Sequence, residues 1–276
     1  SLVYAGGLGV EAALATVGAN STVLGDELAR IGYAGTAEPG FLTPQAYVEL
    51  HIEQGPVLER DGIPLGAVEN LQGISWQRLV IDGVANHAGT TPTAMRRDAG
   101  LAAARIITLL REIAVRSNGT TVATVGALSL EPNAINVIPS RAAMTVDLRD
   151  PDEDRLKAAE AALATFVGEL AASEGVSIAT ERLARFEPVL FDAGIVATIE
   201  DCARARGLAS RRMTSGAGHD AQMLARTCPA AMVFVPSIAG LSHNTAEYTA
   251  PSDIANGLAV LGTLALELAG RANTPA

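Results

Sequence analysis

Four histidines are the residues of this chain best suited to chemistry, and each lies in a short polar or glycine-rich segment. The segments are YVELHIEQGP with His51, ANHAGTTP with His87, SGAGHDAQ with His219 and GLSHNTAEYT with His243. Neutral imidazole binds zinc and transfers protons near pH 7. A single histidine is more often structural than functional, but four in such surroundings favour a catalytic or metal-binding role.

His51 lies in a segment whose residues alternate as in a strand that ends at Gly55-Pro56. Two-residue alternation places Glu49, His51 and Glu53 on one face of that strand. A zinc-bound imidazole needs an acceptor for its second ring nitrogen, and a neighbouring carboxylate supplies one. His51 is therefore a candidate metal ligand.

His243 follows the apolar strand AAMVFVPS and a glycine-containing loop. Sites in α/β proteins are commonly built at such strand ends. Glu247 is close enough in sequence to orient the imidazole of His243. A histidine in a surface loop without a ligand is the alternative interpretation.

His219 and His87 both precede predicted helices. His219 follows SGAG, whose glycines let backbone N–H groups approach a ligand at the positive end of the helix. A plain helix cap by Asp220 is the alternative. His87 lies in the tight turn HAGTTP, for which turn formation alone is the alternative.

Arg149 and Asn136 are the two further polar candidates. Arg149 ends the strand AAMTVDLRD, and its forked guanidinium suits a substrate carboxylate. Asn136 in NAINVIP can donate an amide hydrogen bond beside it. An ion pair of Arg149 with Asp147 or Asp150 is the competing interpretation.

The elements that must position these residues form two groups. Between Ile74 and Glu187 the pattern is strand, helix, two strands, helix, strand, which indicates a ferredoxin-like layer. The expected segments are ISWQRLVIDGVA, DAGLAAARIITLLREIAVRS with Asp98 at its start, TTVATVGALSL, RAAMTVDLRD, PDEDRLKAAEAALATFVGELAASEG and VSIATERL.

The flanking residues alternate helices with short apolar strands, as an α/β layer does. We therefore predict an α/β domain made of residues 1–70 and 190–276, with residues 71–189 inserted into it. The junctions lie near VENLQG and RFEPV.

Composition excludes several classes of protein. The net charge of −10 disfavours nucleic acid or an anionic membrane as the main partner. The apolar stretch from Gly257 to Gly270 contains Glu267 and is expected to be too short to span a bilayer.

Cys202 and Cys228 have no metal-type spacing and are expected to be core residues, although a disulfide between them is the alternative. No secretion signal is recognised at Ser1, so a reducing, cytoplasmic setting is expected.

Five motifs in this order resemble the zinc amidohydrolases that include N-carbamoyl-L-amino-acid hydrolases, allantoate amidohydrolases and β-ureidopropionases. They are YVELHIEQGPVLE, HAGTTPTAMRRDA, NAINVIPS with VDLRDPD, SGAGHDAQ, and PSIAGLSHNTAEYT. The resemblance runs over essentially the whole chain. It implies a zinc-peptidase-like α/β catalytic domain that hydrolyses a carbamoyl or ureido amide in a small ureido acid.

The resemblance also implies roles for individual residues. His51 and His243 would each bind one ion of a two-metal centre, with zinc, manganese, cobalt or nickel as the metal. The substrate contacts would come from Gln54, Asn136, Arg149 and His219, with Arg149 pairing to the substrate carboxylate.

His87 would polarise the scissile carbonyl across a homodimer interface. The inserted unit would then be both a dimerisation platform and a lid.

The chain departs from the family in one respect. Family members carry a His, a bridging Asp and a Glu-Glu pair before the segment that matches SLVYAGGLGV, and none of these is present. We therefore expect an N-terminally truncated, incomplete catalytic domain that alone binds metal weakly and hydrolyses little. The alternatives are a non-catalytic, dimerising, carboxylate-binding fragment and a related deacylase or dipeptidase.

Overall fold

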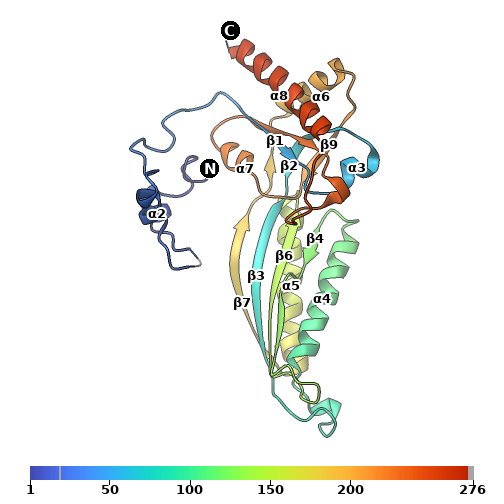
Figure 1. Cartoon of the computed structure of the whole chain (residues 1–276). Coiled ribbons are helices and arrows are strands. Elements are labelled where there is room, and N and C mark those ends of the chain that lie inside the picture. The colour runs from blue at the N-terminus through green and yellow to red at the C-terminus, as the bar shows by residue number, and fades with distance from the viewer. Residues whose placement is uncertain (19, 273–276) are drawn as a thin grey trace. The chain divides into compact units, whose positions relative to one another are not determined.

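A computed structural model describes residues 1–18 and 20–272, and it divides into two compact units (Figure 1). The first unit contains residues 1–71 and 190–276, and the second contains residues 72–189. Both units combine sheets with helices, which confirms the predicted mixed α/β class. The function of the second unit as a lid and dimerisation platform stays a prediction.

The first unit is built on a five-stranded mixed sheet with the order β1-β10-β2-β8, in which β9 also pairs with β2. Strand β1 is parallel to β10, and β10 is antiparallel to β2. The strands are β1 (Tyr47–Ile52), β2 (Leu65–Leu71), β8 (Val189–Leu190), β9 (Ser210–Ser215) and β10 (Ala230–Val235). The helices are α1 (Val10–Leu14), α2 (Leu24–Arg30), α3 (Val57–Asp61), α6 (Ala193–Ala205), α7 (Asp220–Leu224), η2 (Ile238–Gly240) and α8 (Pro251–Ala272).

Strand β10 forms the core of this sheet, since all six of its residues are buried. The continuous apolar run AAMVFV is what a strand covered on both faces requires. Helix α8 packs on β10 and β1, and Val260 and Leu264 are fully buried. A side chain at Gly257 would place its Cβ 2.6 Å from Leu50 Cδ1 and 2.7 Å from Val235 Cγ1, so glycine permits the close approach.

Helix α8 corrects one expectation. The apolar stretch Gly257–Gly270 is expected to be too short to cross a bilayer, but the helix is longer than this stretch. It begins at Pro251 and ends at Ala272. By length and composition, Pro251–Gly270 is one helix that could span a membrane. One side of the helix packs on the sheet through Gly257, Val260 and Leu264, and only 17% of the apolar window is buried.

The second unit is an antiparallel sheet with the order β4-β6-β3-β7, in which β5 also pairs with β6. Helices α4 and α5 lie along one face of this sheet (Figure 1). The elements are β3 (Gly73–Asp82), η1 (Thr93–Met95), α4 (Ala99–Arg116), β4 (Val122–Thr124), β5 (Leu128–Glu131), β6 (Arg141–Asp150), α5 (Glu153–Glu174) and β7 (Ser177–Phe186).

The ends of both long helices in this unit have clear local causes. Asp98 caps α4 by accepting hydrogen bonds from the N–H groups of Gly100 and Leu101. Asp152 caps α5 in the same way through Arg155 N–H. Helix α5 ends at Gly175, whose φ of 63° is the left-handed conformation that glycine adopts at little cost. These residues fix where α4 begins and where α5 begins and ends.

The segment TTVATVGALSL was predicted as one strand, but it forms two. Strands β4 and β5 both pair with β6 and are separated by residues 125–127. In this gap the Thr145 hydroxyl accepts the Ala127 N–H at 3.1 Å, and the Thr145 N–H donates to the Ala127 carbonyl. Gly126 weakens strand continuity, which accounts for the break.

The two cysteines are free and buried, as expected of small core residues.

Candidate active site

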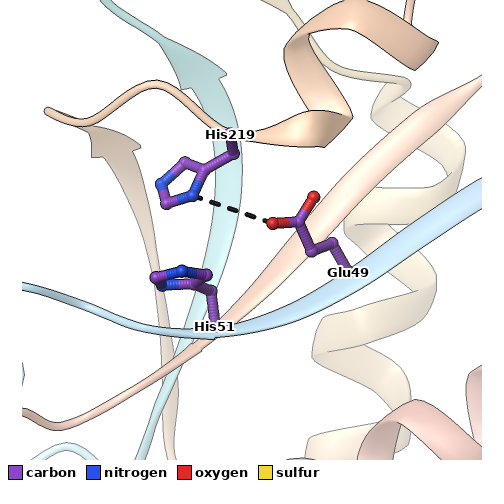
Figure 2. Close-up of side chains that lie close together, drawn as sticks. All are labelled: Glu49, His51 and His219. Carbon is purple, nitrogen blue, oxygen red and sulfur yellow. Dashed lines mark ion pairs between the residues drawn. The ribbon is translucent and has the colours of Figure 1, made fainter. Parts of the chain in front are cut away.

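Glu49, His51 and His219 converge in the first unit (Figure 2). Glu49 and His51 project from the same face of β1, because they are two residues apart, and His219 immediately precedes α7. One ligand atom from each residue lies within 4.8 Å of the others. Figure 2 shows the three side chains pointing toward one another.

Hydrogen bonds fix which nitrogen of His51 carries the proton. His51 Nδ1 lies 2.8 Å from the carbonyl oxygen of Ile52. A carbonyl only accepts hydrogen bonds, so Nδ1 carries the proton and Nε2 keeps its lone pair. This backbone carbonyl therefore prepares Nε2 of His51 as a metal ligand.

The same reasoning applies to His219. Its Nε2 lies 2.9 Å from the hydroxyl of Ser215, which donates its own proton to the carbonyl of Ala217 at 3.0 Å. The Ser215 hydroxyl thus accepts the Nε2 proton of His219, and Nδ1 keeps its lone pair. That Nδ1 faces the Glu49 carboxylate at 3.7 Å.

The electrostatics of His219 favour the neutral form. Burial, followed by the proximity of His51, lowers the pKa of His219 to about 4, although Asp220 opposes this shift. Neutral imidazole is the form that binds a metal ion. His219 is therefore available as a ligand at pH 7 without losing a proton.

Glu49 is held by two neighbours. Its Oε2 accepts the N–H of Ala221 at 2.8 Å in the first turn of α7, which leaves Oε1 facing His219. Burial, followed by the charges of Glu49 and Asp220, raises the pKa of Tyr47 to about 12. The hydroxyl of Tyr47 thus stays protonated beside the Glu49 carboxylate.

This donor set fits a divalent transition metal ion. Two imidazole nitrogens and one carboxylate oxygen are a common protein ligand set for catalytic zinc. Ligand atoms at about 2.0–2.1 Å from a tetrahedral ion lie about 3.3 Å apart, close to the His219–Glu49 separation of 3.7 Å. Small side-chain movements would bring the donors to bonding distance.

Glu53, the third ionisable residue on this face, has a structural role. Its carboxylate accepts the N–H groups of Val57 and Leu58, each at 2.8 Å, and so caps α3. The alternation of β1 placed three ionisable residues together, but only two of them belong to the donor group.

His243 lies outside the donor group in the described part of the chain. Its backbone N–H donates to Glu247 Oε2 at 3.0 Å, and its φ of 55° is unusual for a residue other than glycine. The role of His243 as a metal ligand stays a prediction.

Gln54 lies beside the loop that carries His243. Gln54 Nε2 donates to Ser242 Oγ at 2.9 Å, and Gln54 N–H donates to Ser237 Oγ at 3.0 Å. Gln54 also has a left-handed φ, of 56°. Two predicted site residues are thus held near one another in strained backbone, which is often found at binding sites.

The second unit brings His87 and Asn136 together. The N–H of Ala88 donates to the carbonyl of Asn136 at 2.9 Å, and the N–H of Ile138 donates to the carbonyl of Asn86 at 2.8 Å. Both predicted site residues are exposed at this pairing.

Arg149 forms the ion pair that was its competing interpretation. Its Nε and Nη2 approach the two oxygens of Asp147 at 3.0 and 2.6 Å. The side chains are about one-quarter exposed, at 25% and 26%. A carboxylate that holds the guanidinium in one orientation is compatible with substrate binding, which stays a prediction.

Sequence reasoning did not assign Glu49, Ser215 or Ala221 to the site. Glu49 was placed beside His51 by strand alternation, and that was the signal for it. Ser215 precedes His219 in SGAGH, but nothing in the spacing indicates that its hydroxyl reaches the ring.

Comparison with known proteins identifies similar sequences over most of the chain. The model of peptidase family M20/M25/M40 matches residues 18–267. An N-carbamoyl-L-amino-acid amidohydrolase of Rhizobium meliloti is 38% identical over 267 residues, which cover 97% of this chain and 64% of that protein. The allantoate amidohydrolase of Escherichia coli strain K12 is 38% identical over 232 residues, which cover 83% of this chain and 56% of that protein.

A solved structure is similar in fold as well as in sequence. The crystal structure of a hydantoinase/carbamoylase family amidase from Burkholderia multivorans matches with a TM-score of 0.92 and 40% identity. The match covers 99% of this chain and 66% of that chain. The present chain thus spans less than two thirds of the length of the curated relatives named above.

Proposed function

Because this chain belongs to peptidase family M20/M25/M40, we propose that it takes part in the metal-dependent hydrolysis of a carbamoyl or ureido amide. The observation that carries the proposal is the convergence of Glu49, His51 and His219 with both ring tautomers fixed for metal binding. The names of the similar proteins, N-carbamoyl-L-amino-acid amidohydrolase and allantoate amidohydrolase, support a small ureido acid as the substrate.

The three donors would hold one divalent ion, for which zinc is the first candidate and manganese, cobalt or nickel are alternatives. His243 would contribute to a second ion. A bound ion of this kind activates water and polarises the amide carbonyl. The residues of the chain must then hold the substrate and stabilise charge on its oxygen.

Unit 2 supplies candidates for substrate binding. Arg149 would pair with the substrate carboxylate, and Asp147 would keep the guanidinium fork oriented. His87 and Asn136 would donate hydrogen bonds to the carbonyl oxygen as negative charge develops there. Gln54, held by Ser237 and Ser242 in unit 1, would contact the substrate from that unit.

The role of His219 is open to a direct test, because metal binding and substrate binding predict different results. As a metal ligand, His219 would control the affinity for the ion in the absence of substrate. As a substrate contact, it would control the affinity for the ureido acid once the metal is bound.

We further propose a homodimer through residues 72–189, so that His87 of one copy serves the site of the other. A reducing compartment, the cytoplasm, suits the two free thiols.

The experiment is a pair of binding titrations and a turnover assay on the full 276-residue chain. Zinc is titrated first, and N-carbamoyl amino acids, allantoate, ureidopropionate and N-acyl amino acids are then compared. We expect weak but saturable zinc binding that His51→Ala abolishes, and slow hydrolysis that favours ureido acids over acyl amino acids. Zinc binding unchanged in His51→Ala, or a preference for acyl amino acids, would refute the proposal.

A further inference from the structure

The turn that carries His87 determines the protonation of its ring. His87 Nδ1 accepts the backbone N–H groups of Gly89 at 3.0 Å and Thr90 at 3.2 Å. Because a backbone N–H only donates, Nδ1 carries no proton, and the proton of the neutral ring is on Nε2. A Cβ at residue 89 would lie 3.2 Å from His87 Cε1, so glycine lets the ring lie close to the backbone.

Arg96 holds this turn from within the same unit. Its Nη2 donates to the carbonyl of Ala88 at 2.6 Å, and its Nε donates to the carbonyl of Thr91 at 3.1 Å. The turn is also closed by the Thr91 N–H, which donates to the His87 carbonyl at 3.1 Å. The half-buried guanidinium thus bridges two carbonyls on either side of the N–H groups that bind the imidazole.

The neighbouring Arg97 provides a contrast. Its side chain is exposed and lies near Gly175 at the end of α5, where a Cβ on that glycine would be 3.6 Å from Arg97 Nε. Arg97 has the same charge as Arg96 and a similar place in the chain. It is therefore a matched control for the loss of one arginine from this segment.

We propose that His87 is presented as a hydrogen-bond donor through Nε2–H, and that Arg96 is the positioning residue that holds the turn enforcing this tautomer. The identity of the acceptor, a substrate carbonyl oxygen, rests on the proposed function. The tautomer and the part played by Arg96 are properties of the chain itself. In this state His87 donates a hydrogen bond through Nε2–H and does not serve as a general base.

The test uses NMR on the full chain labelled with ¹⁵N, with the ring signals of His87 assigned by comparison with His87→Gln. We expect an unprotonated Nδ1 and a protonated Nε2. We also expect slow amide exchange at Gly89 and Thr90. In Arg96→Met this exchange should quicken by about tenfold or more, as expected when the support of a hydrogen-bonded turn is removed. Arg97→Met should leave it unchanged.

Two substitutions of His87 distinguish the role of Nδ1 as a hydrogen-bond acceptor from the role of Nε2–H as a donor. In His87→Asn the side-chain oxygen can replace Nδ1 as the acceptor of the turn, since asparagine caps turns in this way. Amide protection at Gly89 and Thr90 should therefore survive in His87→Asn and be lost in His87→Ala. Hydrolysis should fall in both variants, because neither has a donor at the position of Nε2.

The outcomes separate this inference from the proposed function. A proton on Nδ1 of His87 in the unmodified chain would overturn the assigned tautomer. Unchanged amide exchange in folded Arg96→Met would overturn the positioning role, and Arg96→Lys repeats the measurement if that variant does not fold. The expected NMR pattern in a chain that neither binds zinc nor prefers ureido acids would refute the proposed function alone.

Discussion

The imidazole rings of His51 and His219 lie edge to face with their centroids 4.5 Å apart. They come from β1 and from the residue before α7, which are remote in the chain. Burial of His219, followed by its proximity to His51, lowers the pKa of His219, and the consequence can be measured.

Acid should weaken the fold through His219. Its pKa is about 4 in the folded chain and about 6.5 when unfolded, so the unfolded chain binds more protons between these values. The free energy of unfolding of the metal-free chain should therefore fall by up to about 3 kcal/mol from pH 6.5 to pH 4 on account of this residue. Urea unfolding of the chain and of His219→Gln at several pH values measures the difference. An identical pH dependence in both would contradict the assignment.

Glu49 and Glu53 should respond differently to the same substitution. Glu49→Gln replaces a charged metal-binding carboxylate by a neutral amide and should weaken zinc affinity by about tenfold or more. Glu53→Gln weakens the cap on α3 and should lower stability by about 1 kcal/mol while leaving zinc affinity unchanged. Calorimetric zinc titrations and urea unfolding of both variants check this. Equal effects on zinc affinity would show that Glu49 has no special role.

Replacement by alanine should change the stability of the chain in opposite directions at two glycines of α8. Gly257→Ala places a Cβ 2.6 Å from Leu50 and 2.7 Å from Val235, and this clash should cost about 1–3 kcal/mol. At Gly262 no atom lies within 4 Å of such a Cβ, so Gly262→Ala should stabilise the helix by about 0.5–1 kcal/mol. Thermal unfolding of the two variants gives the comparison. Stabilisation by both substitutions would mean that α8 packs less closely on the sheet.

Two aspartates at opposite ends of the β3–β6 strand pair, Asp150 on β6 and Asp82 on β3, should also differ. Asp150 is fully buried and accepts hydrogen bonds from Thr121 Oγ1 at 2.6 Å and Asp152 N–H at 2.8 Å, besides its ion pair with Arg155. Asp150→Ala leaves the buried Thr121 hydroxyl and the Asp152 N–H without their acceptor and should destabilise the chain by about 2–3 kcal/mol. Asp82→Ala removes only an exposed ion pair with Arg141 and should cost less than about 1 kcal/mol. Chemical denaturation measures both, and similar losses would argue against the buried network.

Local signals predict much of the second unit. Asp98, Asp152 and Gly175 act at helix ends, so the limits of α4 and α5 can be inferred from the residues themselves. Gly126 favours a break in the predicted strand TTVATVGALSL, but the position of that break also depends on Thr145, which lies in β6 and bonds to Ala127 in the gap between β4 and β5. A contact of that kind leaves no mark in the local pattern.

The site is predicted less completely, for the same reason. Each histidine can be recognised as a candidate from its own segment. Which of them meet depends on the register of β1 with β10 and on the start of α7, and it is His219 that joins His51 in the donor group. For Arg149, the sequence allowed two interpretations, and the pair with Asp147 is present. Whether Arg149 also binds a substrate carboxylate depends on a second molecule, and the sequence of the chain alone does not describe it.

The chain leaves and rejoins the sheet of the first unit at neighbouring strands. Strand β2 ends at Leu71, and β8, which starts at Val189, lies beside it, with Phe191 N–H bonded to the carbonyl of Glu69. The two chain connections of residues 72–189 thus run to adjacent strands of one sheet. A different folded segment could be inserted between β2 and β8 without changing the direction of either strand. Changes in the loops around His87 therefore need not disturb β1, which carries Glu49.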